Sequence, residues 1–194
     1  MEKLSKFIFK YRSYTPIPFL LVMLYFQQAT PLSLVVGFFI SLLGEFFRLW
    51  GVSVAGSETR TTGDPGGTYL VVSGAFAHVR NPLYLGNILL YTGIGIMSMA
   101  LFPYLQIVAF VYFYFQYRVI IWGEEKYLRK TFGKDFEDYV KNVPRFIPRL
   151  SSYKNKNVVQ PEFDIAKGLK SEKDSLLAFF SVTVILMLFY FLSR

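Results

Sequence analysis

The strongest candidates for a functional site are Arg80, Asn81 and Pro82, at the start of a long apolar run. Asparagine is a favoured N-cap and proline is favoured at the first helical position, so a helix is expected to begin here. The free N–H groups and positive dipole end of such a helix, beside a guanidinium, would suit a carboxylate or a phosphate. The same residues would also serve merely to start a helix, with the arginine snorkelling to the membrane surface. Both interpretations stay open on these residues alone.

Further ionisable residues lie within or next to apolar runs. Glu124 and Glu125 directly follow a run that ends near Trp122. Glu45 and Arg48 lie three residues apart inside another run, so they would share one face of a helix. Ionisable groups at membrane depth are costly and are therefore functional candidates, although a structural ion pair near a helix end is the simpler interpretation of this pair.

Composition removes several kinds of chemistry. The 194 residues include no Cys, which excludes a disulfide framework, a thiolate metal site and a cysteine nucleophile. His78 is the single histidine, so no metal site is predicted. The glycine-rich stretch 63–67 lacks both a G-x-G-x-x-G pattern and a Walker lysine, and a pair of turns explains it. No basic stripe with interleaved aromatic residues indicates a nucleic-acid partner.

Membrane helices must position these residues. Hydrophobic residues make up 53% of the chain and the mean hydropathy is +0.36, while a spanning helix needs roughly 20 mostly apolar residues. Pro31 and Pro103 separate neighbouring apolar runs and predict two tight hairpins. The predicted fold class is therefore all-α, a polytopic membrane bundle of about five transmembrane helices, at residues 17–29, 32–50, 83–102, 104–122 and 176–192.

The basic residues predict the orientation of this bundle. All but one of the 21 Lys and Arg residues would lie on the side of the N-terminus, which the positive-inside rule makes cytoplasmic. A secretory signal peptide over residues 1–29 is the alternative, but no small-x-small cleavage site follows the apolar stretch. The expected location is a prokaryotic inner membrane, with the endoplasmic reticulum as the alternative.

The chain is expected to divide into three parts. Residues 1–150 would form the membrane core, 151–174 a polar tether, and 175–194 a C-terminal transmembrane helix. Apolar residues between 127 and 140 recur at roughly helical spacing and are interrupted by Gly133, which predicts two short amphipathic helices on the cytosolic face. The oligomeric state stays open.

Three groups of residues occur in order: Leu-Val-Val-Ser-Gly-Ala-Phe at 70–76, Arg-Asn-Pro-Leu-Tyr-Leu-Gly at 80–86, and a Glu-Glu, Phe-Gly and Val-Pro series across 124–144. In this combination, residues 68–148 resemble the isoprenylcysteine carboxyl methyltransferase and phospholipid methyltransferase superfamily. The resemblance implies an integral membrane enzyme that uses S-adenosylmethionine without a Rossmann domain. Its acceptor would be a lipid-like or isoprenoid molecule that enters the site from the surrounding membrane lipids, and methyl transfer would take place at the cytosolic face.

The resemblance also implies the site residues. The helix start with Arg80 would hold the anionic end of the cofactor, and Glu124 would hold its ammonium group or ribose hydroxyls. The family often has tyrosine at the position of Phe76, whose ring can still stack on adenine but lacks the hydroxyl. Cofactor contacts are expected from Thr68, Tyr69, Leu70, Val71, Phe76, Asn81, Pro82, Leu83, Tyr84 and Glu124, and catalytic contributions from Arg80, Glu125 and Arg118.

The acceptor stays open at this stage. Enzymes that methylate prenylcysteine carry an arginine four residues before the position of Glu124, where this chain has Ile120, while Arg118 lies six before. This disfavours a carboxylate, and an amine or phenol would need a base, for which Glu45, Glu125 and His78 are available. A membrane reductase of the sterol reductase type, using NADPH, shares an Arg-x-Pro-x-Tyr-x-Gly signature and is the alternative enzyme. A nonenzymatic membrane scaffold is the third interpretation.

Overall fold

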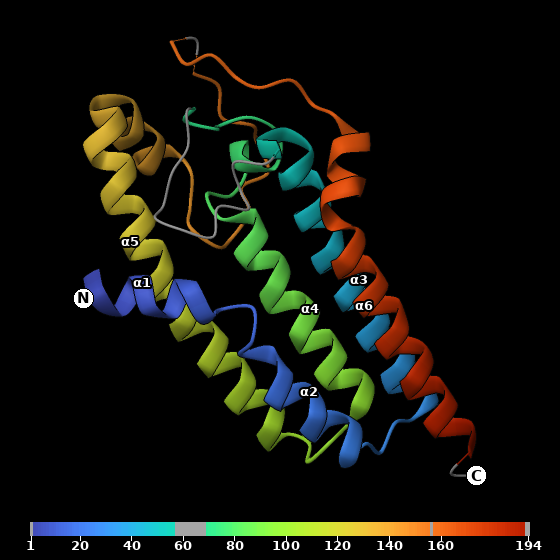
Figure 1. Ribbon diagram of the computed structural model, residues 1–194. Helices are drawn as coiled ribbons and strands as arrows, with labels where there is room; N and C mark the ends of the chain where they lie inside the picture. The colour runs from blue at the N-terminus through green and yellow to red at the C-terminus, as the bar shows by residue number, and fades with distance from the viewer. Residues whose placement is uncertain (1, 57–68, 156, 193–194) are drawn as a thin grey trace.

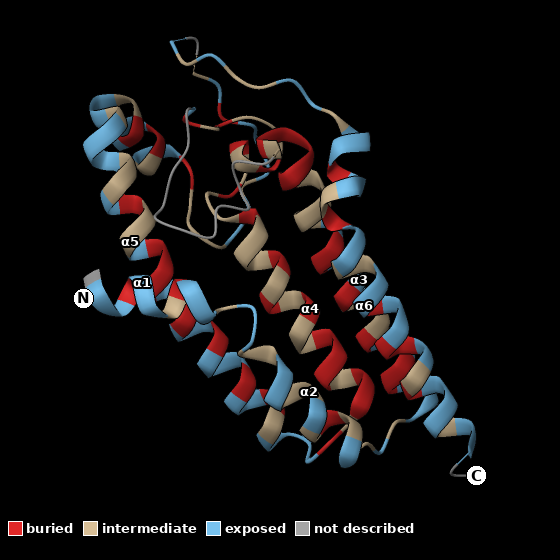
Figure 2. Ribbon diagram, in the orientation of Figure 1, coloured by how far each residue is buried: buried red, intermediate tan, exposed pale blue. Residues whose placement is uncertain are grey.

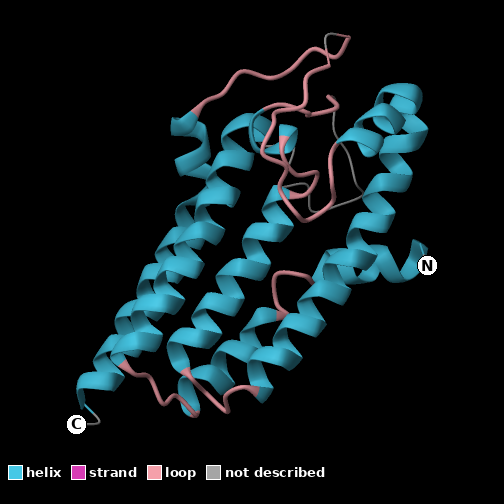
Figure 3. Ribbon diagram, turned by 180° about the vertical axis from the view of Figure 1, so that it is seen from behind, coloured by secondary structure: helices cyan, strands magenta, loops and turns pink. Residues whose placement is uncertain are grey.

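The computed structural model describes residues 2–56, 69–155 and 157–192, in which all regular structure is helical and no strand occurs (Figure 1, Figure 3). The expected all-α class is therefore confirmed. The elements in chain order are α1 (Glu2–Tyr11), α2 (Pro16–Tyr25), α3 (Pro31–Ala55), the 3-10 helix η2 (Gly74–Ala77), α4 (Pro82–Ser98), α5 (Tyr104–Asn142) and α6 (Ile165–Leu192).

Three of these helices are long and apolar enough to cross a membrane, namely α3, α5 and α6. The chain is therefore an integral membrane protein. Helix α2 has only 10 residues and ends at Tyr25, short of the expected 29, and α4 with 17 residues is at the lower limit for a span. The structure thus shows three of the five expected spans.

Local sequence signals explain where α3 and α4 begin. Thr30 caps α3: its hydroxyl accepts from the Ser33 N–H at 3.1 Å, and the Ser33 hydroxyl accepts from the Thr30 N–H at 2.9 Å. Helix α4 begins at Pro82 directly after Asn81, as predicted. The Asn81 side chain does not cap this helix but donates to the carbonyl of Arg145 at 3.2 Å.

The two short helices expected on the cytosolic face, and the start of the last helix, differ from the prediction. Gly133 interrupts α5 with φ 48°, as the sequence predicts, but the first part continues directly from the apolar segment instead of forming a separate helix. Helix α6 begins at Ile165, inside the stretch expected to be a tether. Its buried face includes Gly168 and Glu172, which carry no hydropathy signal, and continues through Phe179 and Thr183.

Helices α3 and α4 pack against each other through glycines. A Cβ placed on Gly44 would lie 2.5 Å from the Gly86 carbonyl oxygen, and one on Gly93 would lie 2.5 Å from that of Gly37. The backbones therefore touch directly, as expected where small residues let membrane helices approach. No described position of α4 is exposed, whereas α2, α5 and α6 each have exposed outer faces (Figure 2).

The arrangement gathers four helix ends at one end of the molecule. The C-terminal ends of α3 and α5 and the N-terminal ends of α4 and α6 lie there, and residues 143–164 cross above them (Figure 1). Helix α1 lies across α5 rather than along it, with Ser5 packed against Gly123. This end holds the functional candidates that the sequence places outside the membrane.

We expect Gly93→Ala to destabilise the protein by about 1–3 kcal/mol, because the new methyl would overlap the backbone of α3. The matched control is Gly95→Ala in the same helix, where the Cβ would meet side-chain atoms rather than backbone: Met23 Cε at 3.3 Å and Gln106 Cγ at 3.4 Å. The measurement is the thermal unfolding midpoint in detergent. Equal midpoints for the two variants would contradict glycine-dependent packing of α3 on α4.

Candidate functional site

A cavity of about 830 Å³ lies among α2, α4, α5 and α6 and reaches the end of the molecule where the helix ends gather. Every expected cofactor residue that the structure describes lines it. Thr68 and the glycine-rich stretch 63–67 lie outside the described residues. The lining residues from the expected set are Tyr69, Leu70, Val71, Phe76, Asn81, Pro82, Leu83, Tyr84 and Glu124.

Tyr84 and Glu124 join the start of α4 to α5. The Tyr84 hydroxyl donates to Oε1 of Glu124 at 2.6 Å, and its ring stacks on Tyr117 with centroids 4.9 Å apart. Arg12, from the connection between α1 and α2, also lines the cavity and exerts an attractive charge interaction on Glu124. The hydroxyl of Tyr84 thus holds one oxygen of the Glu124 side chain at the cavity wall.

The first turn of α4 presents backbone donors to the same cavity. Helix geometry leaves the N–H groups of the first turn without intrahelical partners, and Asn81 does not cap them because its amide donates to another segment. Residues 81–84 all line the cavity. The positive end of the helix dipole is therefore available to an anionic group there.

Arg80 occupies a different place from the one expected. Its Nη1 donates to the carbonyls of Val140 at 2.9 Å and Val143 at 2.5 Å, and its Nη2 lies 3.3 Å from Oε1 of Glu125. Its backbone N–H donates to the carbonyl of Pro144 at 2.8 Å. Although Arg80 lines the cavity, its donors mainly fasten the C-terminal end of α5, so it acts as a positioning residue.

Glu125 and Arg118 also depart from the expected catalytic roles. Glu125 is buried and accepts from Arg145 Nε at 3.0 Å and Nη2 at 2.6 Å, in addition to Arg80. Both carboxylate oxygens are therefore engaged by guanidinium groups, which makes Glu125 a poor base. Arg118 is exposed on α5 and does not line the cavity.

Residues from the C-terminal half of the chain form hydrogen bonds to residues 70–76, which include Phe76. The Tyr139 hydroxyl donates to the carbonyl of Phe76 at 2.7 Å. Gln160 accepts from the Val72 N–H at 2.7 Å and donates to the Leu70 carbonyl at 3.0 Å. These contacts fix the backbone of residues 70–76, which the sequence marks only as turns around a short extended piece.

Residues 149–153 run beside η2 and account for the contacts of His78. The Arg149 N–H donates to the His78 carbonyl at 2.9 Å, and Nδ1 of the same histidine lies 2.9 Å from the Arg149 carbonyl. The Tyr153 N–H donates to the Ala77 carbonyl at 3.0 Å. Burial and a 2.6 Å hydrogen bond to Asp138 raise the pKa of Tyr153 to about 12, so the phenol stays protonated and donates. His78 is thus bonded to residues 149–153 and does not line the cavity.

A polar cluster around Arg48, which the sequence predicted only in part, also lines the cavity. Arg48 of α3 and Glu45 form the expected pair, 3.6 Å apart, and Arg48 also bonds to Asn87 of α4 and Glu172 of α6. The signal for Glu172 was helical spacing to Phe179, hidden by the charged residues around it.

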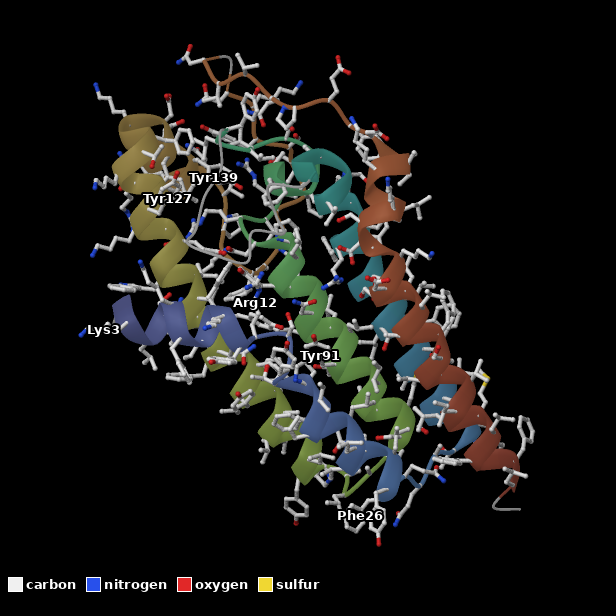
Figure 4. All side chains as sticks on the ribbon, viewed as in Figure 1. Lys3, Arg12, Phe26, Tyr91, Tyr127 and Tyr139 are labelled. Carbon is white, nitrogen blue, oxygen red and sulfur yellow. The ribbon has the colours of Figure 1, made fainter. Side chains whose placement is uncertain are left out.

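Figure 4 shows the side chains of Arg12 and Tyr91 in the interior, with Tyr127 and Tyr139 towards the C-terminal end of α5.

Comparisons with known proteins show the family to which the chain is similar. The family model for phospholipid methyltransferase matches residues 32–135. The cobalt-zinc-cadmium resistance protein CzcN of Cupriavidus metallidurans is 31% identical over 129 residues, covering 66% of this chain and 55% of that protein. The nickel-cobalt-cadmium resistance protein NccN of Alcaligenes xylosoxydans xylosoxydans is 31% identical over 90 residues, covering 46% and 41%. The chain spans about half the length of these curated relatives, and no solved structure matches it.

We expect Glu125→Gln to lower the stability of the fold by about 3–5 kcal/mol, because it removes the carboxylate that compensates Arg80 and Arg145. The control is Glu137→Gln on the same helix, whose ion pair with Arg129 is exposed on both sides and should contribute at most about 1 kcal/mol. Thermal unfolding in detergent measures both. A Glu125→Gln variant as stable as the control would contradict the structural role assigned to this carboxylate.

Proposed function

This chain belongs to the phospholipid methyltransferase family, and from that we propose that it transfers a methyl group from S-adenosylmethionine to a lipid-like acceptor embedded in the membrane. One observation carries the proposal. The described positions expected to contact the cofactor converge on a single cavity, and that cavity continues between helices that are apolar enough to span a membrane. A water-soluble cofactor and a membrane-bound acceptor could therefore meet in it.

The chemistry of the lining residues fits the cofactor. The uncapped first turn of α4 and the guanidinium of Arg12 suit its carboxylate, Glu124 suits its ammonium group or ribose hydroxyls, and Phe76 offers a ring for adenine. When bound, S-adenosylmethionine would supply an electrophilic sulfonium methyl group for transfer to a lone pair of the acceptor, with S-adenosylhomocysteine as the leaving group. The protein's share is to hold the two molecules in line and to keep water out.

Orientation and location follow the same proposal. The helix ends that surround the cavity mouth would face the cytoplasm, because the Lys and Arg residues of the connecting segments gather on that side. Helix α2 with its following residues, and α4, would complete five spans. The relatives are bacterial, which favours a bacterial inner membrane. The names of these relatives concern metal resistance and state no reaction. Among the described residues, no group of three or more His, Cys, Asp or Glu could hold a metal.

We expect calorimetric titration of the full chain in detergent to show binding of S-adenosylhomocysteine and none of NADPH. Glu124→Gln should weaken that binding about tenfold or more, because it replaces a charge-assisted hydrogen bond to the ligand with a neutral one. Glu137→Gln, the same substitution farther along α5, should bind as the wild type does.

The outcomes separate the alternatives. Binding of NADPH alone would overturn methyl transfer in favour of a reductase. Binding of neither ligand would favour a membrane scaffold. S-adenosylhomocysteine binding that is unchanged in Glu124→Gln would leave the reaction class standing and remove Glu124 from the cofactor site.

A further inference from the structure

Helix α1 crosses α5 at the level where α5 changes from apolar to charged. Residues 104–122 of α5 contain one charged residue, Arg118, whereas residues 124–130 contain five. Figure 1 shows α1 running across the axis of α5 rather than along it. Ser5 of α1 packs directly on Gly123, which lies between the two segments. Helix α1 is therefore placed at the boundary between the apolar and the charged part of the bundle.

The side chains at this boundary are typical of a membrane–water interface. Trp122 is 39% exposed, and the Lys126 ammonium lies 5.8 Å from the centre of its ring. Tryptophan is enriched at the headgroup level of membranes, because its ring is apolar while its N–H can reach water. Since α1 crosses α5 next to Trp122, this crossing puts α1 at headgroup level, parallel to the bilayer surface.

One face of α1 packs on the protein, and a second face presents apolar side chains to the surroundings. Ser5 and Phe9 lie four residues apart and are buried. Leu4, Phe7 and Tyr11 share a different face, since they are spaced by three and four residues, and they are 43%, 63% and 42% exposed. In water this second face would leave three large apolar side chains solvated. At headgroup level the same side chains reach the acyl chains of the lipids.

The third face of α1 is cationic. Lys3, Lys6 and Lys10 repeat at three and four residues and are exposed, and Figure 4 shows Lys3 directed away from the bundle. The Lys10 ammonium lies 5.5 Å from the centre of the Tyr11 ring, so the cationic and apolar faces adjoin. A helix with these adjoining faces suits the interface, with its apolar side chains among acyl chains and its lysines among lipid phosphates.

We propose that α1 is a docking surface for anionic phospholipid headgroups, whose charge complements the lysine face. The docked helix also bears on the cavity, which is lined by Phe9 and Arg12. The Arg12 guanidinium lies 3.7 Å from the centre of the Phe9 ring, and its Nη1 donates to the Phe9 carbonyl at 2.7 Å. This part of the cavity wall is therefore continuous with α1, so lipids that hold the helix also hold the wall.

The test is hydrogen–deuterium exchange of the full chain in nanodiscs, read by mass spectrometry of the peptides that cover α1. One set of nanodiscs contains phosphatidylcholine alone, and the other contains phosphatidylglycerol as about one lipid in three. Exchange should be about tenfold or more slower in the anionic nanodiscs, because each lysine near an anionic surface strengthens binding about fivefold. High salt should remove this difference in the wild type, since it screens charges at the surface.

Variants of the lysine face separate charge from other causes. Lys3→Gln with Lys10→Gln should make exchange in the two lipid compositions nearly equal, whereas Lys3→Arg with Lys10→Arg, which keeps the charge, should retain the difference. The matched control is Lys130→Gln with Lys134→Gln, which removes the same charge from exposed positions of α5 and should leave the exchange of α1 as in the wild type.

Three results would overturn the inference: equal exchange of α1 in both lipid compositions for the wild type, a difference that survives Lys3→Gln with Lys10→Gln, or a difference that is lost in the control. None of these readouts uses a cofactor, so the inference and the proposed methyl transfer can fail separately.

Discussion

The direct contact between the backbones of α3 and α4 is the constraint on which the other features depend. The paired glycines Gly44 and Gly86 leave no room for side chains between the helices. That closeness sets Arg48 beside Asn87, and it leaves the opposite face of α4 free to line the cavity. Helix α6 then packs on α3 and brings Glu172 to the same guanidinium. A wider spacing of α3 and α4 would separate Arg48, Asn87 and Glu172 from one another.

The apolar runs and punctuating residues of the sequence predicted much of the fold. Pro31, Pro82 and Gly133 mark two helix starts and one break, because their backbone preferences act locally and need no knowledge of neighbours. The first ten residues of α6 escaped prediction because their buried face uses Gly168 and Glu172, whose burial depends on what α3 presents to them. Hydropathy depends on composition alone, so a helical segment whose charged residue is buried against a partner helix is predicted to be a loop.

The candidate site shows the same division. The family resemblance implied positions that line the cavity, but neither it nor the residue types could assign charges to partners. Arg80 was expected at an anion and instead fastens the end of α5, while Arg12, from a part of the chain that reads as a simple anchor, reaches the cavity. Glu124 and Glu125 are adjacent in sequence, yet one faces Tyr84 and the other is enclosed by arginines. Such pairing is decided by the fold and by the direction of each side chain, so neither could be obtained from spacing alone.

The place of α6 in the chain has a consequence for biogenesis. Translation delivers α3, α4 and α5 to the membrane before α6, so Arg48 must wait within the forming bundle with only Asn87 and Glu45 beside it. The arrival of Glu172 adds a second carboxylate beside Arg48, and the same helix adds the last wall of the cavity. Insertion of the final helix therefore completes the polar cluster and the cavity together, and a bundle without α6 would have neither in its final form.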